Sequence, residues 1–182
     1  MTIRRWGAAV ALGAALLLGG CASVDVRSYA NEKPVLDLAQ FFNGPVDAWG
    51  LVTDRSGKVV RRFTVRLVGT WSGSGDTQTG TLDEHFTYSD GKTEQRVWTL
   101  RKMPGGRYIG TAGDVVGEAL GQAAGNALNW HYTLRLPVDG SVYDVQFDDW
   151  FYQMDDKVLL NRAQMSKFGI KLADITIAFR RP

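Results

Sequence analysis

Short apolar runs alternate with turn signals along most of the chain. From Val46 onward a turn signal recurs about every ten residues, which is the spacing of antiparallel strands joined by hairpins. The candidate turns are Asp54-Arg55-Ser56-Gly57, Gly73 to Asp76, Ser89-Asp90-Gly91-Lys92, Pro104-Gly105-Gly106, Asp139-Gly140 and Asp155-Asp156. Between the turns, apolar and polar residues alternate, as where Phe63, Val65 and Leu67 are separated by polar residues. Because successive strand residues point to opposite faces, each such strand has one apolar and one polar face.

An antiparallel meander of this length has two edge strands whose backbone groups must be covered. Closing the sheet on itself removes both edges, so we predict an all-β fold, an antiparallel up-and-down barrel of the lipocalin-like kind. A two-sheet β-sandwich is the alternative. At 182 residues the chain is long enough for one domain and too short for two comfortable ones. We therefore assign residues 35–182 to a single β-barrel domain.

The Asp139-Gly140 pair predicts a two-residue hairpin turn, because both residues tolerate positive φ. Such a turn sets the register of the two flanking strands. Counting back from it places Tyr132 opposite Phe147 and Trp130 opposite Asp149, and the apolar faces then coincide. Asp149 is therefore predicted to point inward beside Trp130.

The next hairpin decides whether this inward acid has a partner. If Asp155-Asp156 is also a two-residue turn, Phe151 faces Leu160 and Asp149 faces Arg162. A loop one residue longer would turn Arg162 outward, because strand side chains alternate with a period of two.

A second inward acid and arginine follow from the loop around Ser89-Asp90-Gly91-Lys92. Bringing the apolar faces of its two strands together requires an odd number of loop residues, with Gly91 in a bulge. Glu84 and Arg96 then both point inward. Asn126 shares the parity of Trp130 and is expected to join them.

The predicted interior therefore has aromatic walls and two acid–arginine pairs. Two interpretations are open: the pairs can be structural, buried to fix the register. Alternatively, they line a cavity in which an arginine receives a lipid or fatty-acid head group and aromatic side chains hold the tail. The candidate ligand-binding residues are Glu84, Arg96, Trp98, Asn126, Trp130, Tyr132, Asp149 and Arg162.

Residues 110–125 are rich in small side chains. The glycines at 113, 117, 121 and 125 have a helical spacing, but interior glycines would cost an isolated helix about 1 kcal/mol each relative to alanine. The odd-numbered positions of the segment are also nearly all small, so we interpret it as two strands with a small-residue face. Such a face allows another group to approach the backbone closely.

The amino terminus has the parts of a secretory signal. Arg4 and Arg5 precede an apolar stretch, Trp6 to Leu18, that is shorter than the roughly 20 residues of a membrane-spanning helix. Leu18-Gly19-Gly20-Cys21 then resembles the lipobox of bacterial lipoproteins. The resemblance implies that residues 1–20 are a signal peptide and that Cys21 carries a diacylglyceryl thioether and an acylated amino terminus, with chains such as palmitate. An ordinary secretory signal with an incidental cysteine is the alternative.

Residues 21–34 are then the lipidated cysteine and a polar tether, followed by a short helix or turn over Val35 to Phe42. No Asp follows Cys21 directly, and the resemblance to sorted lipoproteins implies the inner leaflet of the outer membrane, facing the periplasm. Several acyl chains make such anchoring stable. Without Arg4 and Arg5 the chain has 19 basic and 19 acidic residues, and this neutrality argues against a nucleic-acid partner.

The sequence holds little recognisable catalytic chemistry. His85 and His131 are its two histidines, both predicted to face outward, and neither has neighbours at metal-ligand spacing, so no metal is expected. It has no phosphate-binding glycine loop or nucleophile elbow, and no cofactor is expected. An enzyme with Asp149 or Glu84 as general acid or base is the weakest hypothesis, which a strongly raised pKa at an open cavity would favour.

Several short blocks of the chain resemble, in their order and spacing, the bacterial lipoprotein family catalogued as domain of unknown function 3833. The blocks are Phe41-Phe42-Asn43-Gly44, Ala48-Trp49-Gly50, Asp54-Arg55-Ser56-Gly57, Arg61-Arg62-Phe63, Asp83-Glu84, Gly110-Thr111-Ala112-Gly113-Asp114-Val115-Val116-Gly117, Gly125-Asn126-Ala127, Asp148-Asp149-Trp150 and Leu160-Asn161-Arg162. The resemblance covers nearly the whole chain after Cys21. It implies a Gram-negative envelope lipoprotein and supplies no catalytic residues to carry over.

Two functional hypotheses are favoured over an enzyme. The first is a lipocalin-like binding module, tethered by its lipid, that sequesters or ferries a lipid or other apolar small molecule. A filled core without a cavity would count against it. The second is a structural or assembly lipoprotein that docks another envelope component through its outer face, which an exposed apolar patch would favour.

Overall fold

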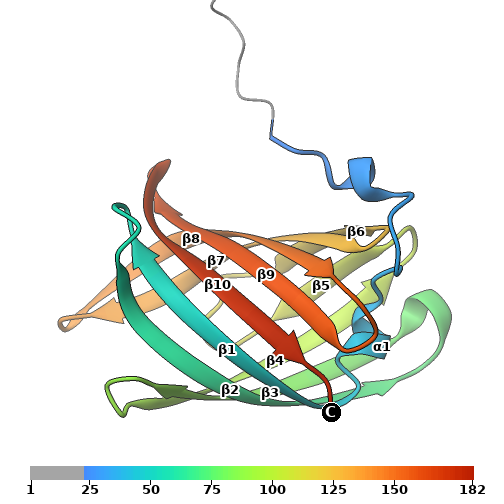
Figure 1. Cartoon of the computed structure of the whole chain (residues 1–182), viewed down its shortest axis with the longest axis horizontal. Coiled ribbons are helices and arrows are strands. Elements are labelled where there is room, and N and C mark those ends of the chain that lie inside the picture. The colour runs from blue at the N-terminus through green and yellow to red at the C-terminus, as the bar shows by residue number, and fades with distance from the viewer. Residues whose placement is uncertain (1–22) are drawn as a thin grey trace, which may run out of the picture.

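The computed structural model describes residues 23–182, so the predicted signal peptide and Cys21 lie outside the described residues. Antiparallel strands form most of this part of the chain (Figure 1). The strands are β1 (Gly44–Asp54), β2 (Val59–Ser72), β3 (Thr79–Tyr88), β4 (Thr93–Met103), β5 (Arg107–Thr111), β6 (Ala119–Ala124), β7 (Ala127–Val138), β8 (Ser141–Gln153), β9 (Val158–Lys167) and β10 (Ile170–Arg180). The short helices are η1 (Val26–Tyr29), α1 (Leu38–Phe41) and η2 (Gly75–Thr77).

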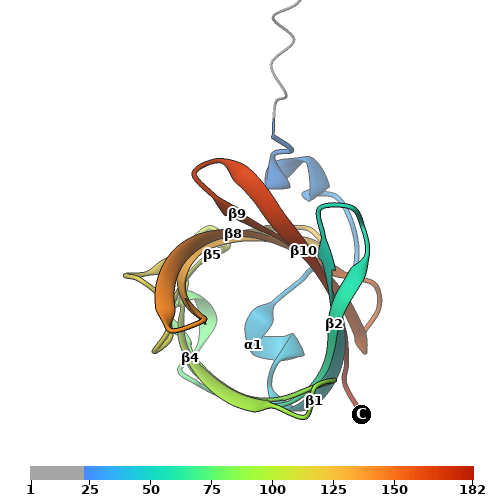
Figure 2. The same ribbon diagram turned by 90° about the vertical axis from the view of Figure 1, so that its left-hand side faces the viewer.

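Each strand pairs with its neighbour in sequence, and β1 pairs with β10 to close the sheet (Figure 2). The closing ladder runs from Asp47 opposite Arg180 to Asp54 opposite Ala173. Closure gives both edge strands of the meander a backbone partner. The predicted all-β, up-and-down barrel is confirmed, and the sandwich alternative is wrong.

The alternating pattern of β2 sorts its side chains between core and solvent. Phe63, Val65 and Leu67 are buried, whereas Arg62 and Arg66 are exposed. Equivalent positions on the other strands join them in one apolar cluster on the inner surface of the barrel. Removing this apolar area from water, worth roughly 25 cal/mol per Å², stabilises the closed sheet.

The hairpin of β7 and β8 has the predicted register. Its Asp139-Gly140 turn has positive φ at both residues, 49° and 80°. Tyr132 pairs with Phe147 and Trp130 pairs with Asp149. Asp149 is buried, so its predicted inward position beside Trp130 is confirmed.

The hairpin of β8 and β9 contradicts the predicted register. Asp149 pairs with Ala163, and Arg162 pairs with Trp150 instead. Arg162 is exposed, so the predicted pair of Asp149 with Arg162 is wrong. Phe151 likewise faces Asn161 and not Leu160.

An extra loop residue explains this shift. The amide of Met154 donates to the carbonyl oxygen of Val158 (2.9 Å), which leaves residues 155–157 as the loop. The Asp155 carboxylate accepts hydrogen bonds from the amides of Lys157 and Val158 (2.7 and 2.8 Å). This local turn stabilises the longer loop, and one added residue reverses the face of every following side chain.

The hairpin of β3 and β4 has the predicted odd-length loop. The amide of Tyr88 donates to the carbonyl oxygen of Lys92 (2.9 Å), and Gly91 has a φ of 83°. Glu84 pairs with Arg96 in the resulting register, and both residues line the interior.

Of the two strands predicted within residues 110–125, only β6 lies inside the segment: β5 ends at Thr111, and residues 112–118 are irregular, so the prediction is correct only in part. A Cβ at Gly110 or Gly121 would collide with the indole ring of Trp130. The small-residue face therefore makes room for a side chain of β7. The irregular segment folds against β7, where the amide of Arg135 donates to the carbonyl oxygen of Asp114 (2.8 Å).

Helix α1 occupies one end of the barrel, which we call the closed end (Figure 2). Its N-cap Asp37 accepts a hydrogen bond from the amide of Ala39 (2.9 Å) and forms an ion pair with Lys102 of β4 (2.7 Å). Phe41 and Phe42 bury their rings in the core. The hairpins that join β1 to β2, β3 to β4, β7 to β8 and β9 to β10 lie at the opposite, open end (Figure 1).

The segment predicted as a tether contacts the barrel along part of its length. Val26 of η1 is buried, and the ring of Tyr29 lies 6.0 Å from that of Trp150 between centroids. The amide of Leu36 donates to the carbonyl oxygen of Gly125 at the closed end (2.8 Å). Across residues 23–182, no helix combines the length and the apolar character needed to cross a bilayer.

Candidate ligand-binding cavity

A cavity of about 840 Å³ runs through the barrel from α1 toward the open end. Leu38 and Phe42 line it at the closed end, and Arg61, Lys92 and Arg135 line it near the open end. Most of the remaining wall is apolar or aromatic. Sites that enclose small molecules have volumes of roughly 300–1,000 Å³, and this cavity lies in that range.

Four aromatic side chains from β4, β7 and β8 form a continuous wall of the cavity. The indole of Trp98 meets the indole of Trp130 and the phenol ring of Tyr132 edge to face, with ring centroids 5.9 and 5.5 Å apart. Tyr132 stacks on Phe147 at 4.9 Å with an interplanar angle of 5°. Such contacts hold bulky rings in fixed orientations, so this wall is preformed.

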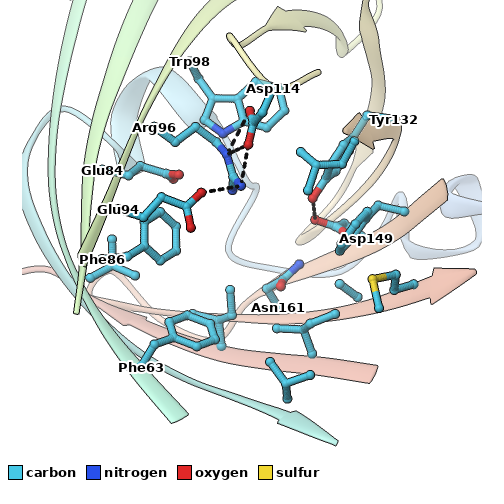
Figure 3. Close-up of a pocket in the computed structure, with 18 of the residues that line it drawn as sticks. Phe63, Glu84, Phe86, Glu94, Arg96, Trp98, Asp114, Tyr132, Asp149 and Asn161 are labelled. Atoms are coloured by element: carbon cyan, nitrogen blue, oxygen red, sulfur yellow. Dashed lines mark hydrogen bonds and ion pairs between the residues drawn. The ribbon is translucent and has the colours of Figure 1, made fainter. Parts of the chain in front are cut away.

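Arg96 lies at the centre of an acidic cluster, two residues before Trp98 on β4 (Figure 3). Its Nε lies 2.9 Å from one Asp114 oxygen, and its terminal nitrogen contacts the same oxygen at 2.8 Å. Glu94 lies 3.5 Å from that terminal nitrogen. Burial alone would lower the pKa of Arg96, but Glu84 and Asp114 raise it above its usual value. The guanidinium therefore stays charged, with its hydrogen bonds directed at residues of its own chain.

Glu84 stands beside Arg96 on the neighbouring strand, as predicted. The ion pairs of Arg96, however, are made with Asp114 and Glu94, so the sequence identified the inward acid but not the partner. Removal from water raises the pKa of Glu84 to about 7, although the Arg96 charge opposes the shift. Near neutral pH this carboxyl is thus poised between its two protonation states.

Asp149 is buried in the wall across the cavity, with 7% of its surface exposed. Its Oδ2 accepts a long hydrogen bond from the hydroxyl of Tyr132 (3.4 Å). Its Oδ1 has no hydrogen-bond partner within residues 23–182. Burial raises the pKa of Asp149 to about 8, and burial together with Asp149 raises the pKa of Tyr132 well above its usual value.

Two predicted site residues lie outside the cavity wall. Arg162 is exposed, for the register reason given above. Asn126 lies in the turn between β6 and β7 at the closed end, where its amide donates to the carbonyl oxygen of Gln153 (3.3 Å). Asn126 is an even number of residues from Trp130, which is why it was expected to point inward, but it precedes β7 and does not line the cavity. The six other candidates line the cavity, namely Glu84, Arg96, Trp98, Trp130, Tyr132 and Asp149.

Sequence reasoning missed Asp114 and the two α1-end residues Leu38 and Phe42. Asp114 lies in the irregular segment 112–118. Side chains there do not alternate between two faces, so counting positions along a strand could not place it. The only available signal was its position as an acid within a run of small residues. The contribution of α1 could not be located from its sequence, since Val35 to Phe42 carries no periodicity that specifies which end of a barrel it enters.

Exposed apolar side chains gather on hairpins at the open end. These are Val59, Val60, Val138, Val142, Phe168 and Ile170, each at least 42% exposed. Phe168 is the extreme case, at 88% exposure and with a φ of 52°, which is uncommon for an aromatic residue. Of these six residues, Val60 also lines the cavity, next to Arg61.

Both histidines face outward, as predicted. His85 and His131 have side chains that are 58% and 57% exposed. Within residues 23–182, no group of three or more His, Cys, Asp or Glu is arranged to hold a metal ion. A general acid typically has a raised pKa, and Glu84 and Asp149 both have this property.

The family model for a protein of unknown function, DUF3833, matches residues 15–181. The chain belongs to this family. No curated protein matches it significantly. Among solved structures, the barrel is similar to the S-type phycobiliprotein lyase CPES from Guillardia theta, with a TM-score of 0.59 and 6% identity over 81% of this chain and 93% of that one. A de novo designed fluorescence-activating β-barrel also matches, with a TM-score of 0.42 and 12% identity over 81% of this chain and 99% of the design.

At 6% identity, the likeness to the lyase establishes the fold and nothing finer. It agrees with the closed antiparallel barrel described above. The family assignment confirms the resemblance found in the sequence blocks.

Proposed function

We propose that this member of the DUF3833 family is an envelope lipoprotein whose barrel binds a lipid or another small apolar molecule. The observation that carries the proposal is the cavity of about 840 Å³, closed by α1 at one end and open at the other. A barrel selected for stability alone would fill such a space, because interiors pack to the density of organic crystals. The lyase with a similar barrel is named for a phycobiliprotein, and its name agrees with a binding role for this architecture.

The chemistry of the wall supports an apolar ligand. Apolar and aromatic side chains from β1 to β4 and from β7 to β10 surround the space, and the stacked Tyr132 and Phe147 offer a rigid surface for a hydrocarbon chain or ring system. At the open end, Val60 continues this surface to the outside beside the charged Arg61.

The proposed location in the cell envelope rests on the amino-terminal sequence. Leu18-Gly19-Gly20-Cys21 supports lipidation at Cys21, and the residues after it support retention at the inner leaflet of the outer membrane. A tethered barrel facing the periplasm would sequester or ferry its ligand next to that membrane.

The test is native mass spectrometry of the mature Cys21→Ser protein purified from a Gram-negative host, with extraction of any passenger. We compare it with Ala163→Trp, which places an indole in the cavity beside Asp149. The matched control is Arg162→Trp, the same change at the adjacent, outward-facing position. We expect a reproducible apolar passenger in the parent and the control and a strongly reduced occupancy in Ala163→Trp, with all three proteins folded by circular dichroism.

A parent protein that stays empty, even when offered fatty acids and phospholipids, would contradict the binding role. That outcome would favour the second candidate, a lipoprotein that docks another envelope component. The exposed apolar side chains at the open end, such as Val142, Phe168 and Ile170, would then be the docking surface.

A further inference from the structure

One buried oxygen in the cavity wall lacks the hydrogen bond that its position demands. Asp149 has 7% of its surface exposed, and its Oδ1 finds no partner within residues 23–182. Its other oxygen has only the 3.4 Å contact with the Tyr132 hydroxyl. An unsatisfied buried polar atom costs roughly 1–3 kcal/mol, and such atoms in folded proteins call for an explanation. A group of the ligand that donates to Oδ1 would remove this cost.

Arg96, the buried cation expected to receive an anionic head group, already has its partners. Its Nε and a terminal nitrogen both contact Asp114, at 2.9 and 2.8 Å, and Glu94 stands 3.5 Å away. A ligand carboxylate would have to displace Asp114, whose backbone is held to β7 by the hydrogen bond with the Arg135 amide. The carboxylates of Asp114 and Glu94 therefore already occupy the positions beside Arg96 that a ligand anion would need.

The charges that face the cavity interior disfavour a second anion. Around Arg96 the wall carries the carboxyls of Glu84, Glu94, Asp114 and Asp149. The other cations of the wall, Arg61, Lys92 and Arg135, lie near the open end, and Arg61 is paired with Asp90 (3.1 Å). A buried anion without a paired cation is strongly disfavoured, whereas a donor opposite a carboxylate makes one of the stronger hydrogen bonds.

We propose that the ligand bears a hydrogen-bond donor, an amine, amide or hydroxyl group, that reaches Oδ1 of Asp149, and that ligands with a carboxylate or phosphate head are rejected by the interior. This inference rests on the proposed binding function and names the chemical class of the ligand. The apolar part of the molecule lies against the Trp98, Tyr132 and Phe147 wall. Its donor group reaches Asp149, which lies two residues after Phe147 on β8.

The experiment compares three compounds with one chain length and different head groups: dodecylamine, dodecanol and laurate. Each competes at pH 9 with diphenylhexatriene, a fluorescent hydrocarbon that carries no polar group, for the mature Cys21→Ser protein. This pH lies above the raised pKa of Asp149, about 8, so the carboxyl is ionised. We expect dodecylamine to displace the hydrocarbon best, dodecanol next and laurate least. The expected ratio between the first and the last is on the order of tenfold or more, because hydrogen bonds to charged groups are worth roughly 1.5–3 kcal/mol.

Two variants assign the preference to Asp149. In Asp149→Asn the advantage of dodecylamine over laurate should fall by on the order of tenfold, since an amide can donate to a carboxylate. Diphenylhexatriene should still bind this variant. The control is Asp148→Asn, the same change on the neighbouring residue, whose side chain is 48% exposed on the outer face. It should keep the parent order.

The outcomes separate this inference from the proposed function. If neither diphenylhexatriene nor any dodecyl compound binds, the binding function fails and the inference fails with it. If the hydrocarbon binds but laurate competes as well as dodecylamine, the cavity is functional and the inference alone is wrong. If Asp149→Asn displaces the hydrocarbon with the same order of compounds as the parent protein, the inference is also wrong, because the selectivity then comes from other groups. The order in the parent protein tests the proposal even if a variant does not fold.

Discussion

At the residue scale, the unusual feature is a pair of acids held inside an apolar barrel. Asp149 on β8 and Glu84 on β3 both have raised pKa values, about 8 and about 7, and burial is the main cause for each. Arg96 opposes both shifts without abolishing them. Such groups make the stability of the barrel depend on pH near neutrality.

We predict that the free energy of unfolding falls as the pH rises from about 5 to 9. The usual pKa of Asp149 is 3.8 and its folded-state pKa is about 8, so the folded protein holds an extra proton between these values. Its contribution is therefore fully present below the unfolded-state pKa and is lost as the pH rises through about 8. Glu84 acts in the same direction up to about 7. The combined loss should be on the order of a few kcal/mol, measured by urea unfolding at pH 5, 7 and 9.

Asp149→Asn should flatten this pH dependence, because the amide has no proton to lose in this range. Asp148→Asn on the outer face should change the slope only slightly, because the Asp148 charge raises the pKa of Asp149 less than burial does. Equal slopes in the parent and in Asp149→Asn would show that Asp149 titrates normally in the folded barrel.

At the element scale, the cavity depends on how α1 meets the sheet. The carbonyl oxygen of Phe42, just after α1, occupies the space that a Cβ at Gly69 of β2 would need. The same oxygen accepts a hydrogen bond from the indole Nε1 of Trp71 (3.2 Å). Asp37, the N-cap of α1, forms an ion pair with Lys102 of β4. The closed end is thus held by backbone contacts that tolerate little displacement.

Gly69→Ala should destabilise the protein by roughly 1–3 kcal/mol, the usual cost of overpacking, because the colliding atom belongs to the backbone and cannot swing aside. The measurement is urea unfolding followed by far-ultraviolet circular dichroism. Gly113→Ala is the matched control: its added Cβ meets no atom within 4 Å. A loss of stability no greater than that of the control would mean that α1 is free to shift.

At the scale of the whole molecule, the barrel has two different ends. The amino-terminal segment packs at the closed end, where Tyr29 and Leu36 contact the turns and strands near Gly125. The hairpins with exposed apolar side chains form the other end (Figure 1). A lipid attached at the amino terminus would therefore be joined to the barrel from outside, without passing through the cavity.

The proposed anchor makes a separate prediction. In cells, Cys21→Ser should move the protein from the membrane fraction to the soluble periplasmic fraction and abolish labelling with radioactive palmitate. Ser23→Ala, a change of similar size two residues away, should leave both properties as in the parent. Membrane retention of Cys21→Ser without palmitate label would contradict the lipid anchor and would direct attention to the apolar open end.

The alternation of apolar and polar residues determined the strands, their buried faces and the closed meander, because a period of two is a local property that each strand carries by itself. The Asp139-Gly140 turn determined in the same local way that Asp149 faces inward beside Trp130. The tertiary structure alone decided the loop length after β8, which turned Arg162 outward, and the contact of Asp114 with Arg96. It also decided that α1 closes one end. The loop length depends on which amides the Asp155 carboxylate accepts hydrogen bonds from, and residue type alone does not specify this. The other two features lie in irregular segments, where no periodicity specifies direction, so only the packing of the complete barrel could set them.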